Sequence, residues 1–310
     1  MQVTLNANEI DLPTRVYDIQ GAFDLRLAAA PVAWGRGRWP NVDWVEGALT
    51  WAGWENDVVA VRRARQGSNS AQLFIEGNSS PDLDRAWLDA VLGCSRPMPS
   101  FSDHVLAGLA LRMPGLRAFA NGSLFDGVIS SIVGQSISVA AAATTERRLA
   151  ALVHEGVMVA GRLYFPSPRG CDLAELTAAD VRTTGVTWRR AEAIVAIARI
   201  HESGEFPEDP TDPGDLGQTR NALRALPLVG PWTAESAMLW GLGLPDIFPS
   251  GDVALLRAAR RAYERPEMTM KEMDLLAEGW RPWRSWAARL LWTDLLGPAP
   301  APELAEDCAG

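Results

Sequence analysis

The periodicity of apolar residues changes near residue 105, and this change constrains the fold more than any other feature of the chain. Before it, Gly, Asn and Asp separate short apolar runs that are typical of strands. These runs are residues 23–30, 48–55, 57–65 and 71–77. After it, apolar residues recur at helical spacing. We therefore predict an α+β protein, with an N-terminal antiparallel β-sheet domain in residues 1–105 and a mainly α-helical core in residues 106–297.

Helices are predicted on both sides of this change. Residues 81–93 form an amphipathic segment that Gly93 would end. The helices expected in the core are residues 123–135, 138–156, 187–204, 216–226, 271–280 and 284–297. We expect the Pro- and Asp-rich residues 206–216 to form a surface loop, and residues 298–310 to form a disordered tail.

Five tryptophans crowd the N-terminal domain. They are Trp34, Trp39, Trp44, Trp51 and Trp54. Indole rings remove a large apolar area from water when they are buried. We expect these rings to pack in the core or on a face of the sheet, rather than to stack on a ligand.

The net charge of −9 argues, at first, against a partner as acidic as nucleic acid. Six acidic residues and no basic residue lie in residues 202–215, and three more acids lie in residues 298–310. These nine account for the whole excess of 38 acidic over 29 basic residues. The acidity is confined to one loop and one tail, which leaves room for a basic surface elsewhere.

The cysteines and the apolar runs bear on the compartment and on metal binding. Cys94, Cys171 and Cys308 are odd in number and far apart, which fits a reducing compartment and gives no metal-ligand spacing. No apolar run reaches the roughly 18 residues that a membrane span needs. The first residues also lack the pattern of a secretory signal. We expect a cytoplasmic protein without a metal site and without a membrane partner.

The segment PLVGP, residues 227–231, joins two helix-patterned runs with very little chain. A helix that restarts there exposes amide groups that carry the positive end of its dipole, and such a start can seat a phosphate. Gly230 permits a positive φ and the close approach of another backbone, and Pro231 suits a first helical turn. Thr233 adds a hydroxyl group. From the segment alone, a plain connection between two helices is the favoured interpretation.

A lone carboxylate, Asp252, precedes the helical run VALLRA without a His, Ser, Cys or Lys beside it. An aspartate in this place commonly caps a helix. The same side chain could stabilise positive charge in a reaction. The two roles are compatible, because capping fixes the direction in which the carboxylate points.

Three motifs together resemble the helix-hairpin-helix DNA glycosylase superfamily, and within it the 3-methyladenine DNA glycosylase II branch. The first is LPLVGPWTA followed by DIFPSGDVALLRA, similar to the family hairpin and its catalytic-aspartate loop. The second is FDGVISSIVGQSISVAAA, similar to the family's glycine-glutamine helix junction. The third is GWRPWRSWAARLLW, similar to its C-terminal tryptophan-arginine motif. The resemblance covers about residues 110–297, whereas the N-terminal sheet is only weakly similar.

The resemblance implies a helical core of two subdomains with an active-site cleft between them. It implies double-stranded DNA as the partner, with an alkylated base flipped out of the duplex, since the bond to be broken is hidden in the stack. Asp252 would be the catalytic residue, stabilising the cation that develops on the sugar. Bifunctional relatives carry a nucleophilic lysine where this chain has Trp232, so hydrolysis should leave an abasic site without cutting the strand.

The resemblance also implies a base pocket formed by Trp232 and Trp292. An indole face attracts a cationic base by about 0.5–2 kcal/mol. Ser236 and Val253 stand where similar enzymes often have aromatic residues, so we expect a barer pocket with an altered preference. Both tryptophans could instead be structural.

DNA contacts are implied at Gly230, Thr233, Gln135 and Ser136. Leu228 stands where the family usually has glycine, which affects both the hairpin shape and the monovalent cation that hairpin carbonyls hold in relatives. Ser136 stands where similar enzymes place a bulky wedge that fills the gap left by the flipped nucleotide. Either Gln135 or Ile137 takes over that role, or the chain acts on lesions that flip readily. We favour the second alternative.

The sequence thus favours a monofunctional DNA N-glycosylase of base excision repair, monomeric, that excises alkylated purines of the 3-methyladenine and 7-methylguanine type. The alternative is a catalytically weak or inactive damaged-DNA-binding protein of the same fold. A helical scaffold without a nucleic-acid role is disfavoured by three motifs in family order.

Overall fold

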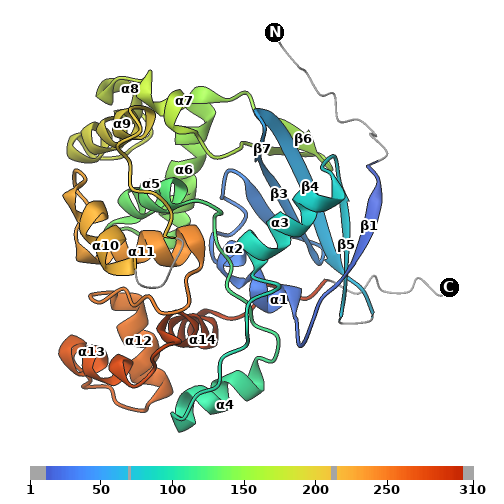
Figure 1. The fold of residues 1–310 in the computed structure, drawn as a ribbon, viewed down its shortest axis with the longest axis vertical. Helices are drawn as coiled ribbons and strands as arrows, with labels where there is room; N and C mark the ends of the chain where they lie inside the picture. The colour runs from blue at the N-terminus through green and yellow to red at the C-terminus, as the bar shows by residue number, and fades with distance from the viewer. Residues whose placement is uncertain (1–11, 69–70, 211–214, 303–310) are drawn as a thin grey trace, which may run out of the picture.

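The computed structural model describes residues 12–68, 71–210 and 215–302, and it has a sheet side and a helical side. Figure 1 shows the sheet on one side, the helices α5 to α14 on the other, and α2 between them. The buried apolar residues form one core under the sheet and a larger core within the helices. The observed architecture is the predicted α+β combination. The domain boundary at residue 105 stays a prediction.

The five-stranded sheet is antiparallel throughout, with the order β1-β5-β4-β3-β2. Its strands are β1 (Thr14–Asp18), β2 (Val42–Val45), β3 (Ala48–Glu55), β4 (Val58–Gln66) and β5 (Gln72–Gly77). The three predicted strand runs after residue 45 are confirmed. The edge strands β1 and β2 were not predicted from the sequence.

The strand predicted at residues 23–30 is wrong, since this segment forms α1 (Leu25–Ala28) and the start of α2 (Ala30–Trp34). Asp24 caps α1, and its carboxylate accepts hydrogen bonds from the amides of Arg26 and Leu27. Residues 28–30 are three consecutive buried alanines. Alanine is the strongest helix former, and a run buried on all sides does not alternate as a half-exposed strand would.

Helix α3 (Pro81–Leu92) packs on the sheet and ends as predicted at Gly93, which adopts φ +62°. Beneath it the fully buried Arg62 lies between the rings of Trp51 and Trp87, about 5.4 and 5.5 Å from their centroids. The guanidinium donates to the buried carboxylate of Asp84 over 2.8 Å. Trp51, one of the five N-terminal tryptophans, therefore packs against the sheet core, as expected.

The helical core contains the helices predicted from the sequence, together with short additional ones. Their bounds are α4 (His104–Arg112), α5 (Leu124–Gly134), α6 (Val139–Val153), α7 (Gly170–Ala174), α8 (Ala178–Arg182), α9 (Trp188–Glu202), α10 (Leu216–Ala225), α11 (Pro231–Leu242), α12 (Val253–Ala262), α13 (Met270–Glu278) and α14 (Arg284–Leu296). The loop expected at residues 206–216 separates α9 from α10, and its residues 211–214 lie outside the described part of the chain.

Helices α5 and α11 cross at very short range because glycines face each other at the crossing. A Cβ atom on Gly127 would lie 2.3 Å from the carbonyl oxygen of Ala237, and one on Gly241 would lie 2.5 Å from that of Ser123. Larger side chains at either position would push the helices apart. This crossing fixes α11, which follows the hairpin, against α5, which precedes the glycine-glutamine junction.

Helices α5 and α6 meet at a sharp bend of 119°. Ser138 caps α6 by accepting a hydrogen bond from the amide of Ala141. Within the described ranges, no single helix is long and apolar enough to cross a membrane, and this bent pair reaches that length only when both helices are counted together.

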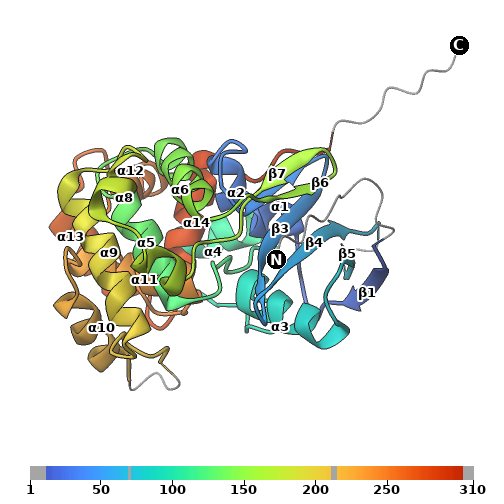
Figure 2. The ribbon, with the colours of Figure 1, turned by 90° about the horizontal axis from the view of Figure 1, so that it is seen from above.

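The core is not helical throughout, because β6 (Val157–Val159) and β7 (Arg162–Tyr164) form a two-stranded hairpin. Figure 2 shows it beside β3 and β4 on the sheet side of the molecule. Val157, Val159 and Tyr164 share a small core with Ala52 and Val61. A segment from the middle of the chain therefore completes the N-terminal domain.

Residues 298–302 differ from the disordered tail expected for residues 298–310. Ala299 is fully buried. Its amide donates to the carbonyl oxygen of Arg26 over 3.0 Å, and the Nε of Arg26 donates to the carbonyl oxygen of Ala299 over 3.1 Å. Trp44 donates its indole N–H to the carbonyl oxygen of Pro300 over 2.9 Å. Residues 303–310 lie outside the described part of the chain.

Candidate active site

A cleft with a volume of about 820 Å³ separates the N-terminal domain from the helices. Helices α5, α6, α11, α12 and α14 line one side, and residues 31–42 line the other. The resemblance implied a cleft between two helical subdomains, but here the N-terminal domain supplies a wall as well. Trp34 and Trp39 belong to that wall, so two of the five N-terminal tryptophans face the cleft instead of packing only in a core.

Asp252 lines this cleft and is the N-cap of α12. The capping role is therefore observed, and the catalytic role stays a prediction. Its Oδ1 accepts a hydrogen bond from the amide of Leu255 over 2.7 Å. Its Oδ2 accepts one from the indole Nε1 of Trp232 over 3.1 Å. These two donors from different helices hold the carboxylate in one orientation, and neither is a cation that would neutralise its charge.

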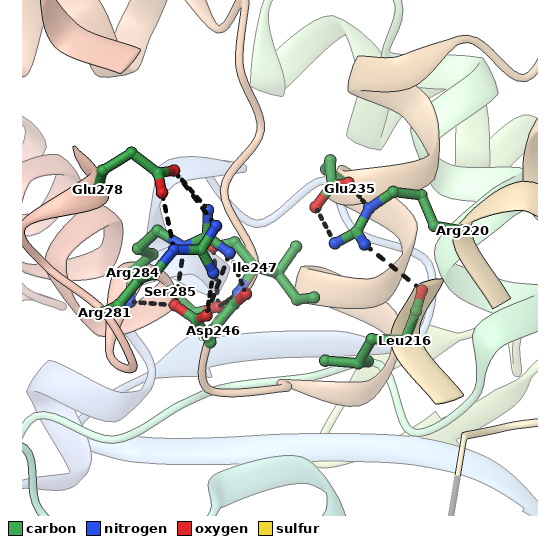
Figure 3. Close-up of polar contacts among 9 residues, drawn as sticks. All are labelled: Leu216, Arg220, Glu235, Asp246, Ile247, Glu278, Arg281, Arg284 and Ser285. Atoms are coloured by element: carbon green, nitrogen blue, oxygen red, sulfur yellow. Dashed lines mark hydrogen bonds and ion pairs between the residues drawn. The ribbon is translucent and has the colours of Figure 1, made fainter. Parts of the chain in front are cut away.

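The loop that carries Asp252 is anchored at its start by the C-terminal tryptophan-arginine motif (Figure 3). Arg284, only 8% exposed, donates from Nε to Oδ1 of Asp246 over 2.7 Å and from NH2 to its carbonyl oxygen over 3.0 Å. Ser285 accepts from the amide of Ile247 over 2.9 Å and donates to its carbonyl over 3.1 Å. Arg281 adds a 2.8 Å bond to Asp246. The third motif thus positions the loop that carries Asp252.

Trp232 and Trp292 both line the cleft, as the resemblance implied, but they do not stack on each other. Trp292 is 5% exposed and stacks on Trp240, with 5.3 Å between ring centroids and 29° between planes. Trp240 lines the cleft two helical turns after Trp232, and sequence reasoning missed it. Its spacing of eight residues from Trp232 on one helix face was the available signal.

Ser236 and Val253, which stand where similar enzymes often have aromatic residues, both line the cleft. Ser236 lines the cleft from α11 between the two tryptophans and is buried. Val253 lines it from the first turn of α12 and is 75% exposed. The pocket therefore has one stacked pair of rings on its wall and open apolar surface at its lip.

The hairpin contains a left-handed residue at Leu228, the position where the resemblance would place a glycine. Leu228 adopts φ +62°, a conformation that disfavours a side chain by roughly 1–2 kcal/mol. Gly230, in contrast, has φ −86°, so the positive φ considered for it does not occur. A Cβ atom added there would meet nothing within 4 Å. Neither packing nor backbone conformation within the protein requires glycine at position 230. A glycine there would instead let the backbone of another molecule approach closely.

Helix α11 starts directly at this half-buried glycine, whose Cβ position is open. Gly230 is its N-cap and supplies no side-chain hydrogen bond, and Pro231 occupies the first turn. The amides that follow carry the positive end of the helix dipole. The carbonyls of Leu226 and Leu228 each accept a hydrogen bond within the protein, and a carbonyl oxygen can accept two. A monovalent cation at the hairpin is compatible with this geometry and stays a proposal.

Gln135 and Thr233 turn inward to connect the two motifs. The Nε2 of Gln135 donates to the carbonyl oxygen of Leu228 over 3.2 Å and to Oγ1 of Thr233 over 3.0 Å. The hydroxyl of Thr233 is buried with its residue. Both side chains therefore position the hairpin, and their predicted DNA contact is not visible in their present geometry.

Ser136 and Ile137 are exposed where the cleft opens. Ser136 adopts φ +58°, and Ile137 is 41% exposed. Gln135 is engaged by the hairpin, whereas the apolar side chains of Ile137 and Val139, each 41% exposed, line the cleft beside it. Of the two wedge candidates that the sequence named, Ile137 is the one that the hairpin does not hold.

Charged residues in the cleft were also missed. Asp126 on α5 and Glu146 on α6 line it, and so does the exposed Arg257 on α12. Burial raises the pKa of Asp126 to about 6 and that of Glu146 to about 7. In the sequence these carboxylates resemble ordinary solvated charges, because their burial arises from tertiary packing. Among the described residues, no group of three or more His, Cys, Asp or Glu side chains is placed to hold a metal ion.

Comparison with known proteins matches residues 129–282 to the family described as HhH-GPD superfamily base excision DNA repair protein. The chain is 32% identical over 195 residues to DNA-3-methyladenine glycosylase 2 of Escherichia coli (strain K12), covering 63% of this chain and 66% of the relative. It is 27% identical over 194 residues to DNA-3-methyladenine glycosylase of Bacillus subtilis (strain 168), covering 62% of this chain and 63% of the relative. It therefore spans slightly less than two thirds of either relative.

The fold is also found in a solved structure described as 3-methyladenine DNA-glycosylase from Archaeoglobus fulgidus. The TM-score is 0.78 with 21% identity, over 91% of this chain and 98% of that one. The likeness extends over the N-terminal sheet, whose sequence is only weakly similar to the family.

Proposed function

The chain belongs to the HhH-GPD superfamily of base excision DNA repair proteins, and on this premise we propose that it is a monofunctional DNA N-glycosylase. Its substrate would be double-stranded DNA with an alkylated purine of the 3-methyladenine or 7-methylguanine type. Hydrolysis would release the base and leave an abasic site. The relatives named for 3-methyladenine support this substrate class.

The observation that carries the proposal is the placement of Asp252. Its carboxylate lies in the wall of the cleft, held by Leu255 and Trp232 without a neutralising cation. An alkylated purine is already a good leaving group, so the difficult part of the reaction is the positive charge that develops on the sugar. A fixed carboxylate stabilises that charge without reorganising.

A nucleophilic amine is missing from the position where bifunctional relatives would have one, since Trp232 occupies it. An indole cannot form a Schiff base with the sugar. The product is therefore an intact strand with an abasic site. The chemistry uses only the carboxylate and water, so we expect excision to continue in EDTA.

DNA would approach the side of the molecule where the hairpin, the α5–α6 junction and the start of α12 meet at the cleft. Gly230 would bring the first amides of α11 to a phosphate, and Arg257 in the cleft lining would supply a second contact. Thr233 and Gln135 would act by holding the hairpin, and Ser136 by allowing the chain to turn at the lip. We further propose that the protein acts as a monomer in the cytoplasm, associated with the nucleoid in a bacterium.

The alternative is a catalytically weak or inactive damaged-DNA-binding protein of the same fold. The observation that favours it is the barer pocket, with Ser236 and Val253 in place of aromatic rings. Both proteins would bind damaged DNA, so binding alone does not distinguish them.

The test uses a duplex in which one purine is methylated, incubated with the purified protein and then divided into two portions. The proposal predicts free methylated base in solution and strand breaks that form only in the portion heated with alkali. Breaks in both portions would indicate a lyase and overturn the monofunctional mechanism. Binding of the duplex without release of base would indicate the alternative protein.

A further inference from the structure

Glu146 is a charged residue in an otherwise apolar stripe of α6. The residues of this helix that line the cleft are Val139, Ala142, Glu146 and Leu149, at the three- and four-residue spacing of one helix face. A solvated glutamate would lie on the opposite face. Glu146 thus projects into the same cleft as Asp252, from a different helix.

The carboxylate of Glu146 has a single polar partner of its own. Ser130 on α5 donates its hydroxyl to Oε1 over 2.7 Å. In the described part of the chain no cation pairs with Glu146, and the charged group that acts on it is Asp126, another carboxylate. Asp126 in turn is affected by His201 on α9. Burial raises the pKa of Glu146 to about 7, so the folded protein disfavours its ionised form.

A half-buried carboxylate with one hydroxyl donor and a like-charged neighbour weakens the fold relative to a neutral side chain of the same shape. Stability therefore gives no reason for a glutamate here. The remaining capacity of the carboxylate, at Oε2, is available to a group that enters the cleft.

Positive charge already lies behind the tryptophans that α11 and α14 contribute to the cleft. The guanidinium of Arg289, itself buried, lies 4.6 Å from the ring centroid of Trp240, which stacks on Trp292. A cation held against an indole uses part of the attraction that the ring would offer to a second cation. The stacked tryptophans are then a poor selector of base charge by themselves, and carboxylates elsewhere in the cleft would have to supply that selection.

We propose that Glu146, oriented by Ser130, is a specificity-determining residue that accepts hydrogen bonds from amino or ring N–H groups of the flipped base and favours cationic bases over neutral ones. This rests on the proposed glycosylase function. Ionised carboxylates only accept hydrogen bonds, so they fit N–H donors and repel carbonyl oxygens. In DNA, 7-methylguanine is cationic and carries a 2-amino group, whereas hypoxanthine is neutral and lacks that amino group. Both bases have a 6-carbonyl and an N1–H, so the charge and the amino group are what Glu146 would distinguish.

The experiment compares two duplexes of the same sequence, one with 7-methylguanine and one with hypoxanthine. Single-turnover excision rates are measured at pH 8, where Glu146 is largely ionised, and their ratio is the readout. Glu146→Gln keeps the shape and the acceptor for Ser130 but removes the charge. Ser130→Ala removes the orienting hydroxyl. Glu155→Gln changes an exposed glutamate just after the same helix and is the matched control.

We expect the ratio to fall about 10-fold in Glu146→Gln, the factor that one charge-assisted hydrogen bond provides. Ser130→Ala should show a smaller fall, and Glu155→Gln none. Should the wild type act on hypoxanthine too slowly to measure, the same fall is expected in the 7-methylguanine rate alone, with affinity for undamaged duplex unchanged. An unaltered ratio, or an unaltered 7-methylguanine rate in that case, overturns the role of Glu146.

Failure of this inference differs from failure of the proposed function. A wild-type protein that releases neither base contradicts the glycosylase proposal itself. A wild-type protein that releases 7-methylguanine, with a Glu146→Gln variant of the same selectivity, contradicts only the role of Glu146. A ratio that changes equally in Glu155→Gln would show a general charge effect and would also overturn the specific role.

Discussion

The indole N–H of Trp232 donates a hydrogen bond of 3.1 Å to Oδ2 of Asp252, so the residue that replaces the lysine of bifunctional relatives orients the candidate catalytic carboxylate. The two side chains come from α11 and α12 and meet at the cleft. The substitution therefore does more than remove a nucleophile. It supplies a neutral donor that fixes the carboxylate and leaves its charge intact.

Trp232→Phe tests this relationship because it keeps an aromatic ring and removes the donor. A hydrogen bond to a charged group is worth about 1.5–3 kcal/mol, of which part would be lost from the transition state. We expect kcat for excision of a methylated purine to fall about 10-fold, with a small change in KM. Equal kcat values for Trp232→Phe and wild type would show that Asp252 needs no orientation from the indole.

Arg284→Ala tests the anchoring of the loop that carries Asp252. Removing one partner of a mostly buried, bidentate pair leaves Asp246 without its main donor, at roughly 3–5 kcal/mol. We expect a clear loss of stability in urea unfolding and a lower excision rate at temperatures where the variant is still folded. Arg265→Ala, which breaks an exposed pair with Glu272, is the control and should lose less than about 1 kcal/mol. Similar losses in both variants would contradict the anchoring role.

Ile137→Ala tests which side chain fills the space of the flipped nucleotide. The structure disfavours Gln135, which is bound to the hairpin, and places Ile137 with 41% exposure at the cleft. Loss of an apolar wedge should slow excision from a fully paired duplex about 10-fold and leave excision from single-stranded DNA nearly unchanged. Leu152→Ala, on α6 and equally exposed at 41%, is the control. A paired-duplex rate that survives in Ile137→Ala would favour the alternative that the protein acts on lesions that flip readily.

The pH dependence of stability tests the burial of Glu146. Its pKa is raised from 4.5 to about 7 in the folded protein, by burial and by Asp126 on α5. The protonated form is favoured by folding, so its contribution is fully present below pH 4.5 and is lost as pH rises through about 7. Glu146→Gln should match the wild type in urea unfolding at pH 4 and exceed its free energy of unfolding at pH 8 by about 1–3 kcal/mol. A constant difference across this pH range would contradict the raised pKa.

The sequence predicted those parts of the molecule in which local pattern and motif agree. The hairpin before α11, the junction of α5 and α6, and the loop to Asp252 all lie where the motifs placed them. Helix caps and helical periodicity depend on residues close together in the chain, so they can be recognised in the sequence.

What the sequence did not reveal depends on contacts between distant segments. Glu146 resembles a surface charge until Ser130, sixteen residues earlier, and the cleft are brought against it. The alanine run at residues 28–30 has the apolar character of a strand, and nothing local in the sequence shows that all three residues are buried. The β6–β7 hairpin and the ordered Ala299 both pack on a domain that lies far away in the chain.

The most direct test of the account is the release of methylated purine from duplex DNA by Asp252→Asn. The amide keeps a cap acceptor for Leu255 and nearly the same volume, and it removes the negative charge. We predict that base release falls about 100-fold or more while affinity for the duplex stays close to that of the wild type. An Asp252→Asn protein that releases base at the wild-type rate would contradict the central claim that this carboxylate carries the reaction.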